Sequence, residues 1–292
     1  MPLFVLPARS PPGEPHSEIF GLKIATLPPL REALDAAGLG ARKRFGQHFL
    51  LDLNICRKIV RIAEVSEGDH ILEVGPGPGG LTRALLEAGA RVTAVEKDPR
   101  FFPLLQDLGA AAEGRLTVIK DDALAFDETE KLCPGASVVA NLPYNVASPL
   151  LVKWLIGPFR PESLTLMFQA EVARRIAASP GGADYGRLGV LSRAVCDCRI
   201  AMTLPARAFT PPPKVDSAVV RLRPRADPPP AWLIERLQIV TAAAFGQRRK
   251  KLRSSIKELG GADLCLRAGV DPDARAETVS IAGFLSLAEH SA

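Results

Sequence analysis

The sequence predicts an α/β fold, a mostly parallel and doubly wound sheet with helices on both faces, followed by a small helical domain. Two observations support this prediction. Between residues 55 and 222, apolar runs typical of buried strands alternate with amphipathic stretches typical of helices. After three consecutive prolines at 228–230, only helical periodicity continues. We therefore expect an N-terminal extension with a short helix (1–40), an α/β domain (41–224) and a helical domain (225–292).

The chain opens with a stretch that is poorly suited to packing, and a short helix follows. Residues 1–28 are rich in proline, which disfavours regular structure. Leu30, Leu34 and Ala37 then recur at helical spacing, and glycines follow them. A second helix is expected over residues 55–65, because its isoleucines fall on one face that can pack against a sheet.

Short apolar or alternating runs predict the strands of the sheet. In chain order, strands are expected over residues 70–75, 91–98, 116–124, 137–144, 164–169, 200–205 and 217–224. Amphipathic stretches between the strands predict the covering helices, over residues 80–89, 148–156, 170–178 and 185–196. Because helices separate most of these strands, the sheet is expected to be mostly parallel.

Composition narrows the classes of function. The chain has 292 residues, 47% of them hydrophobic, and a net charge of +5 that favours polyanionic partners. Its apolar runs fall short of the ~20 residues of a membrane span, and the N-terminal apolar run is too short for a signal peptide. The cysteines are dispersed without a C-x-x-C pair. We expect a cytoplasmic protein, a monomer by default, with no metal site and no membrane contact.

A glycine-rich turn follows the first expected strand. In "EVGPGPGGLT" (73–82), Gly75, Gly77 and Gly80 satisfy the G-x-G-x-x-G pattern of a dinucleotide site. However, Pro76 and Pro78 remove backbone N–H groups that a pyrophosphate would need as donors. The turn therefore indicates a nucleotide-like ligand without a phosphate.

Acidic residues at three strand ends agree with that ligand. Glu73 ends the first strand, where a carboxylate suits a cation, and Glu96 ends the second, where it can accept from two ribose hydroxyls. Asp121 or Asp122, after the third strand, can accept from an adenine amino group. A cationic adenosine ligand without phosphate is S-adenosylmethionine, so we predict this cofactor.

The fourth strand leads into "NLPYN" (141–145). An exocyclic adenine amino group is a poor nucleophile, because its lone pair is delocalised into the ring. Two acceptors aimed at its N–H groups, the Asn141 side-chain carbonyl and a backbone carbonyl of the turn Leu142-Pro143, would favour attack. Tyr144 can stack on the base, which contributes roughly 1–3 kcal/mol. The alternative is an ordinary Asn-Pro turn that closes a strand.

Two basic clusters predict the nucleic-acid surface. In "QRRKKLRSSIK" (247–257), a helix would place Arg249, Arg253 and Lys257 on one face, while Leu252 and its apolar neighbours pack on another. A solvated helix face is the alternative. The candidate RNA-binding residues are Arg42, Lys43, Arg44, Arg248, Arg249, Lys250, Arg253 and Lys257.

Taken together, these motifs resemble those of the small-subunit ribosomal RNA adenine N6,N6-dimethyltransferase family, in the family's order. The matching stretches are "KRFGQHFLLD" (43–52), "EVGPGPGGLT" (73–82), "VEKD" (95–98), "NLPYNVASPLL" (141–151), "MFQAEVARRI" (167–176), "YGRLGVLS" (185–192), "FTPPPKVDSAVVRL" (209–222) and "FGQRRKKLRSSI" (245–256). The resemblance implies a Rossmann-like class I methyltransferase sheet with a small C-terminal helical domain.

The resemblance also implies a reaction and a set of residues. Family members use S-adenosylmethionine to dimethylate two adjacent adenines near the 3′ end of 16S rRNA, in the small ribosomal subunit or its precursor. Phe209 matches an aromatic that helps Tyr144 to clamp the base. With the residues derived above, the candidate cofactor-binding set is His48, Leu50, Glu73, Gly75, Gly77, Glu96, Asp122 and Asn141.

Two other functions are compatible with the sequence. A DNA adenine-N6 or large-subunit rRNA methyltransferase would share the Asn-Pro-aromatic chemistry, and the stretches 209–222 and 245–256 favour the small-subunit enzyme over it. The chain could also act mainly as a ribosome-assembly or transcription factor. The intact "NLPY" favours retained catalysis.

Overall fold

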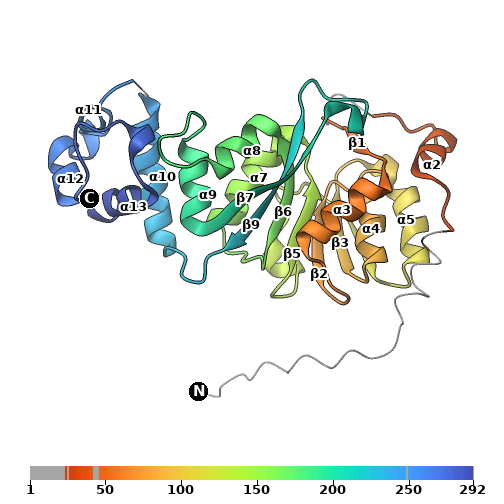
Figure 1. Ribbon diagram of the computed structural model, residues 1–292. Coiled ribbons are helices and arrows are strands. Elements are labelled where there is room, and N and C mark those ends of the chain that lie inside the picture. Colours follow the sequence, from red (N-terminus) through yellow and green to blue (C-terminus); the bar gives the residue numbers. More distant parts are fainter. Residues whose placement is uncertain (1–23, 25, 42–45, 248, 292) are drawn as a thin grey trace, which may run out of the picture.

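The computed structural model describes residues 24, 26–41, 46–247 and 249–291. Its centre is a seven-stranded sheet with the order β4-β3-β2-β5-β6-β9-β7 (Figure 1). The strands are β2 (His70–Val74), β3 (Arg91–Glu96), β4 (Leu116–Lys120), β5 (Ser137–Asn141), β6 (Leu164–Gln169), β7 (Cys196–Leu204) and β9 (Ser217–Pro224). Strands β2 to β6 pair in parallel, whereas β9 runs antiparallel to both β6 and β7. The predicted mostly parallel sheet is confirmed.

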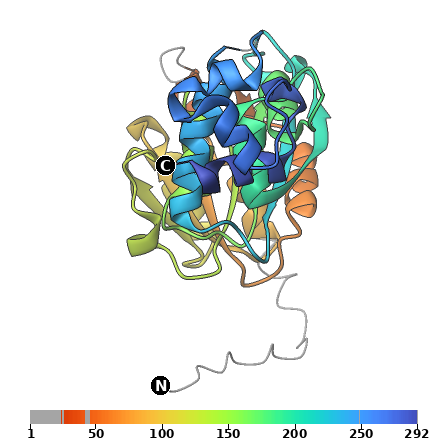
Figure 2. The ribbon, with the colours of Figure 1, turned by 90° about the vertical axis from the view of Figure 1, so that its left-hand side faces the viewer.

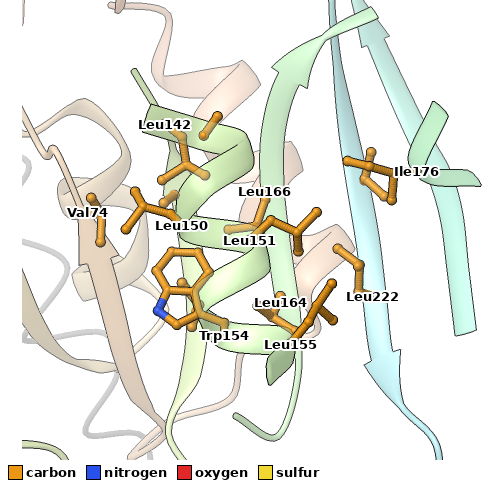
Figure 3. Close-up of a cluster of buried hydrophobic side chains, with 14 of the residues drawn as sticks. Val74, Leu142, Leu150, Leu151, Trp154, Leu155, Leu164, Leu166, Ile176 and Leu222 are labelled. Carbon is orange, nitrogen blue, oxygen red and sulfur yellow. The ribbon is translucent and has the colours of Figure 1, made fainter. Parts of the chain in front are cut away.

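Helices cover both faces of this sheet. They are α3 (Leu53–Ala63), α4 (Gly80–Glu87), α5 (Phe102–Ala111), α7 (Tyr144–Ile156), α8 (Ala170–Ala177) and α9 (Arg187–Val195), with a short α6 (Glu128–Lys131). Because successive strand residues point to opposite faces, Leu72 packs with α7 whereas Ile71 packs with α3 and α4. Figure 3 shows the first of these layers, in which Leu150, Leu151 and Trp154 of α7 meet strand residues.

Most expected elements are present, with differences at their ends. One difference is at the turn after β5, where the strand was expected to reach residue 144 and the next helix to begin at 148. The strand ends at Asn141, and α7 begins at Tyr144, because Pro143 adopts φ −58° and ψ 127° and serves as the N-cap. Strand β7 also begins earlier than expected, at Cys196. Helix α5 was not predicted.

Helices alone follow the last strand, as predicted. They are α10 (Ala231–Gly246), α11 (Leu252–Ser255), α12 (Gly261–Arg267) and α13 (Ile281–His290), and Figure 2 shows them facing the viewer. Their apolar core is shared with the α/β part, because Tyr185, Val190 and Ala194 pack into it beside Leu237 and Phe284. The division at residue 225 therefore follows the change of secondary structure, while the hydrophobic core crosses it.

A two-stranded sheet joins distant parts of the sequence near the carboxyl ends of the parallel strands. In it, β1 (Phe49–Leu50) pairs antiparallel with β8 (Phe209–Thr210). Helix α2 (Leu30–Ala36), the predicted N-terminal helix, packs Leu34 against Phe49. The segment that contains His48 is thereby held over the edge of the main sheet. Among the helices of the described residues, none is long and apolar enough to cross a membrane.

Candidate active site

The glycine-rich turn between β2 and α4 has a conformation that requires glycine. Gly75 and Gly77 have φ of +68° and +54°, in the left-handed region that other residues rarely adopt. A Cβ atom on Gly80 would lie 2.5 Å from the Leu50 carbonyl oxygen, so only glycine allows the two segments to approach. The turn thus leaves space above the strand ends and brings the His48 segment close to it.

A cavity of about 270 Å³ opens at this edge of the sheet, close to the lower limit of roughly 300 Å³ typical of small-molecule sites. Parallel strands of an open sheet present ligands at their carboxyl ends, and β2, β3 and β5 all end here. The structure brings all eight candidate cofactor residues to its walls, and the catalytic candidates Leu142, Pro143 and Tyr144 as well. Residues from five separate stretches of the sequence thus meet around one space.

Glu96 lies in this wall with 6% of its surface exposed. Its Oε2 accepts a hydrogen bond from the Gly77 amide at 3.0 Å, and its Oε1 accepts one from the Asp98 amide at 2.7 Å. Burial raises the pKa of the Glu96 carboxyl. The two amides fix the carboxyl group, and each oxygen keeps a second lone pair for a hydroxyl donor.

Glu73 is more deeply buried and differs from the expectation of an ionised carboxylate. Burial raises its pKa to about 8, so the carboxyl is mostly neutral at pH 7 in the protein alone. Among the described residues, Oε2 makes no hydrogen bond of good geometry, although the nearby Thr82 hydroxyl lowers the pKa against the larger effect of burial. An unpartnered buried oxygen beside a cavity is compatible with a cationic ligand, which would favour the ionised form.

The two aspartates after β4 both line the cavity but differ in their contacts. Asp122 pairs with the Lys97 ammonium at 2.6 Å through Oδ2 and accepts from the Leu124 amide at 3.1 Å through Oδ1. The hydrogen bond from Lys97 lowers the pKa of Asp122. Asp121 is exposed and accepts from the Asp122 amide at 2.7 Å. Both aspartates remain candidates for an adenine amino group.

The turn after β5 presents acceptors to the cavity. The Asn141 Nδ2 donates to the His48 carbonyl oxygen at 3.3 Å, which orients the amide, so that its Oδ1 is the atom able to accept from a substrate. The Pro143 carbonyl accepts from the Val146 amide in the first turn of α7, so the Leu142 carbonyl is the backbone candidate of this turn. The Leu142 side chain itself is buried in the core.

Tyr144 is held by contacts that the sequence did not predict. Its hydroxyl lies 2.6 Å from the Ser217 hydroxyl. The His48 imidazole stacks on its ring, with 5.6 Å between the ring centroids and 27° between the planes, and the His48 Nδ1 donates to the Pro211 carbonyl at 2.8 Å. No local signal indicated these partners, because Ser217 lies 73 residues from Tyr144 and Pro211 lies 163 residues from His48 in the sequence.

The structure does not bring Phe209 to the cavity. It was expected to clamp the base with Tyr144, but only 3% of its surface is exposed, and it packs in the core with Leu204 and Val219. Among the described residues, those that line the cavity do not include it. The cause is the pairing of Leu50 with Phe209 in the two-stranded sheet, which turns this side chain into the core.

The basic segment also requires a correction. Helix α10 ends at Gly246 and α11 begins only at Leu252, so the single helix expected through residues 247–257 is absent from this part of the described chain. Leu252 packs in the core of the C-terminal helices. Arg253 is exposed and pairs with Asp273 at 3.2 Å, and Arg249, Lys250 and Lys257 are exposed as well. Arg42, Lys43, Arg44 and Arg248 lie outside the described residues.

The fold and the site together define a class I methyltransferase. The defining features are the open sheet, the glycine turn after β2, the buried acidic residue at the end of β3 and the Asn-Leu-Pro-Tyr turn after β5. Comparison with known families gives the narrower assignment. The Ribosomal RNA adenine dimethylase family matches residues 38–292, and the chain belongs to this family. It is therefore an enzyme, an rRNA adenine dimethyltransferase.

Individual relatives agree with the assignment. Ribosomal RNA small subunit methyltransferase A of Phenylobacterium zucineum is 64% identical over 270 residues, 92% of this chain and 94% of the relative. A dimethyladenosine transferase from Plasmodium falciparum superposes with a TM-score of 0.69 at 25% identity, over 82% of this chain and 96% of that one. The 23S rRNA methyltransferase ErmE gives 0.63 at 29% identity, over 83% and 99%.

Proposed function

We propose that this enzyme transfers methyl groups from S-adenosylmethionine to N6 of two adjacent adenines near the 3′ end of 16S rRNA, during biogenesis of the small ribosomal subunit. The observation that carries the proposal is the meeting, around one cavity, of the Asn141 acceptor, the Tyr144 ring and the Glu96 carboxyl. The similarity to a small-subunit methyltransferase over 92% of the chain favours that RNA as substrate.

The cavity wall suits the cofactor. Glu96, fixed by two amides, can accept from the ribose hydroxyls, and Asp121 or Asp122 can accept from the adenine amino group. The unpartnered Oε2 of Glu73 fits a ligand of positive charge. The backbone of His48 and Leu50 closes the cavity from above the glycine turn. Bound there, S-adenosylmethionine supplies an electrophilic methyl group on its sulfonium.

The turn after β5 acts on the target adenine. The Asn141 Oδ1 and the Leu142 carbonyl accept hydrogen bonds from the two N6 hydrogens, so that the nitrogen lone pair is directed at the methyl carbon. Tyr144 stacks on the base. The stack of the His48 imidazole on the Tyr144 ring supports this role, because it indicates that the ring can accommodate a flat aromatic partner. No strong base is needed, since N6 loses its proton to water after the methyl group is transferred. Positioning supplies most of the rate enhancement.

Partners and location follow from this substrate. We infer that the protein acts in the cytoplasm, where ribosomal subunits assemble, and as a monomer. The basic side chains of Arg249, Lys250 and Lys257 are proposed to contact rRNA phosphates, since they are exposed and unlike charges attract over a Debye length of ~10 Å. Arg253 would have to exchange its partner Asp273 for phosphate.

The likeness to ErmE favours a large-subunit substrate as the second candidate. Both are tested by incubating the protein and labelled cofactor with undermodified small subunits, bare 23S rRNA and double-stranded DNA. We expect dimethyladenosine in the small-subunit RNA only, measured by mass spectrometry of nuclease digests. Methylation confined to 23S rRNA or to DNA would contradict the proposal.

A further inference from the structure

Tyr144 carries a hydroxyl that the proposed stacking does not use. A phenylalanine would offer the same ring face to a base, so the tyrosine requires a separate explanation. In the structure this hydroxyl lies 2.6 Å from the Ser217 Oγ, and the two groups form a hydrogen bond. Burial raises the pKa of the Tyr144 hydroxyl, so the group stays protonated and serves as a hydrogen-bonding group rather than as a base.

Ser217 is placed to act as a fixed anchor. It is the first residue of β9, where its backbone pairs with Gln169 of β6 on one side and Leu204 of β7 on the other. Its exposed fraction is 0%. A residue whose backbone is paired on both sides cannot follow a moving loop, so the hydrogen bond connects Tyr144 to the end of a strand that is fixed within the sheet.

Three contacts restrain Tyr144 from different sides. Its backbone is fixed by Pro143 at the start of α7, one ring face is covered by His48, and the far end of the ring is held by Ser217. The His48 contact is a stack and resists sliding only weakly. Without the hydroxyl pair, the ring could tilt about its bond to the backbone, and its plane would no longer match that of a base held by Asn141.

We propose that Ser217 is a positioning residue of this methyltransferase: its hydroxyl holds the Tyr144 ring at the angle required for stacking on the target adenine. The inference rests on the proposed function for the identity of the base. Ser217 itself touches neither substrate nor cofactor, and it acts through Tyr144 alone. The hydroxyls of the two residues should therefore behave as one unit.

The kinetic test uses Ser217→Ala, Tyr144→Phe and the double variant, with undermodified small subunits as substrate. We expect each single change to lower kcat about tenfold with KM for the cofactor almost unchanged, and the double variant to lose no more than either single one. Ser217→Thr, which keeps the hydroxyl, should recover most of the rate. Losses that add in the double variant would overturn the proposal.

A spectroscopic test is independent of any substrate. The chain has two tyrosines, so ¹³C labelling at the tyrosine ring carbon that bears the hydroxyl gives two NMR signals, and Tyr144→Phe assigns them. We expect Ser217→Ala to shift and broaden the Tyr144 signal. Tyr185, whose hydroxyl donates to the Val279 carbonyl at 3.0 Å, is the internal reference and should not change.

Ser192→Ala is the matched control. Ser192 is also fully buried, and its hydroxyl has no hydrogen-bond partner among the described residues, so this variant removes a buried hydroxyl without touching Tyr144. An unchanged Tyr144 signal in folded Ser217→Ala, or an equal change in Ser192→Ala, would overturn the inference. If Ser217→Ala does not fold, Ser217→Thr and Tyr144→Phe still test the hydroxyl pair. Inactivity of the wild type on small subunits would contradict only the proposed function, since the NMR result does not depend on it.

Discussion

The cavity at the sheet edge and the basic segment 247–257 both take part in the proposed reaction, yet they are built on opposite principles. In the cavity, Asn141, Glu96 and Tyr144 are each held by at least one hydrogen bond from a distant part of the chain. In the segment, the described charges lie on the surface, and the pairs that they form are exposed. Both partners of the pair between Arg253 and Asp273 are 49% exposed.

The difference reflects what each region has to do. Methyl transfer depends on atoms placed within fractions of an ångström, so the fold fixes those atoms with buried contacts. Attraction to a polyanion depends mainly on the number of nearby charges. The loss of the expected helix in the segment therefore leaves its proposed role intact, whereas we expect an equal change of backbone at the turn after β5 to abolish catalysis.

The largest effect should come from the fixed region. Asn141→Ala removes the side-chain acceptor, and we expect methylation to fall by roughly 10²–10³-fold, the usual loss when one preorganised hydrogen-bonding group is removed from an active site. Binding of rRNA, measured by filter retention, should remain within about twofold. Asn141→Asp keeps an acceptor oxygen and should retain more activity. A normal rate for Asn141→Ala would show that the acceptor role is wrong.

The second prediction concerns the buried acid at the same edge. The pKa of Glu73 is raised by burial to about 8 in the folded protein, above an unfolded value near 4.3. The folded state therefore binds the proton more tightly than the unfolded state does. The contribution of this proton to the stability of the folded protein is complete below pH 4 and is lost as the pH rises to about 8. Glu73→Gln cannot titrate and should lack this loss.

Urea unfolding between pH 5 and pH 8 measures that difference. The wild type should lose stability relative to Glu73→Gln by on the order of 1 kcal/mol per pH unit. Above pH 8 the difference should level off. Parallel pH profiles for the two proteins would contradict the neutral, buried state of this carboxyl and would place its oxygens in contact with solvent.

The smallest effect should come from the surface region. Arg249→Glu together with Arg253→Glu should weaken rRNA binding about tenfold at low salt and flatten its salt dependence, because fewer counterions are released. Arg249→Glu alone should account for most of the loss, since Arg253 already pairs with Asp273. Glu258→Lys is the control, because it adds positive charge in the next turn and should strengthen rather than weaken rRNA binding. Binding that is unchanged across a salt titration would exclude this segment as the RNA contact.

The prediction of the fold succeeded where local pattern decides structure. The strands over residues 70–74, 91–96 and 164–169 and the glycine turn between the first of them and α4 are close to their expected positions. Parallel strands bring their carboxyl ends to one edge, so the sequence alone predicts that Glu73, Glu96 and Asn141 share one site.

Prediction failed where contacts between distant residues decide. Phe209 lies in the core because it pairs with Leu50, which is far away in the sequence. The basic segment leaves its helix between Gly246 and Leu252, and there the Leu252 amide donates to the distant Ala274 carbonyl instead of to a helical partner. Neither contact can be predicted from hydrophobic periodicity, because periodicity shows only which face of an element is apolar.

Residue order alone was enough to predict the alternation of helices and strands, the glycine turn and the acceptors after β5, because these depend on backbone sterics and on periods of two or 3.6 residues. Only the folded chain could place Ser217 against the Tyr144 hydroxyl, lay His48 on that ring and withdraw Glu73 from solvent. Hydrogen bonding across 73 residues and desolvation depend on the three-dimensional neighbours of a group, and those neighbours exist only once the sheet has formed.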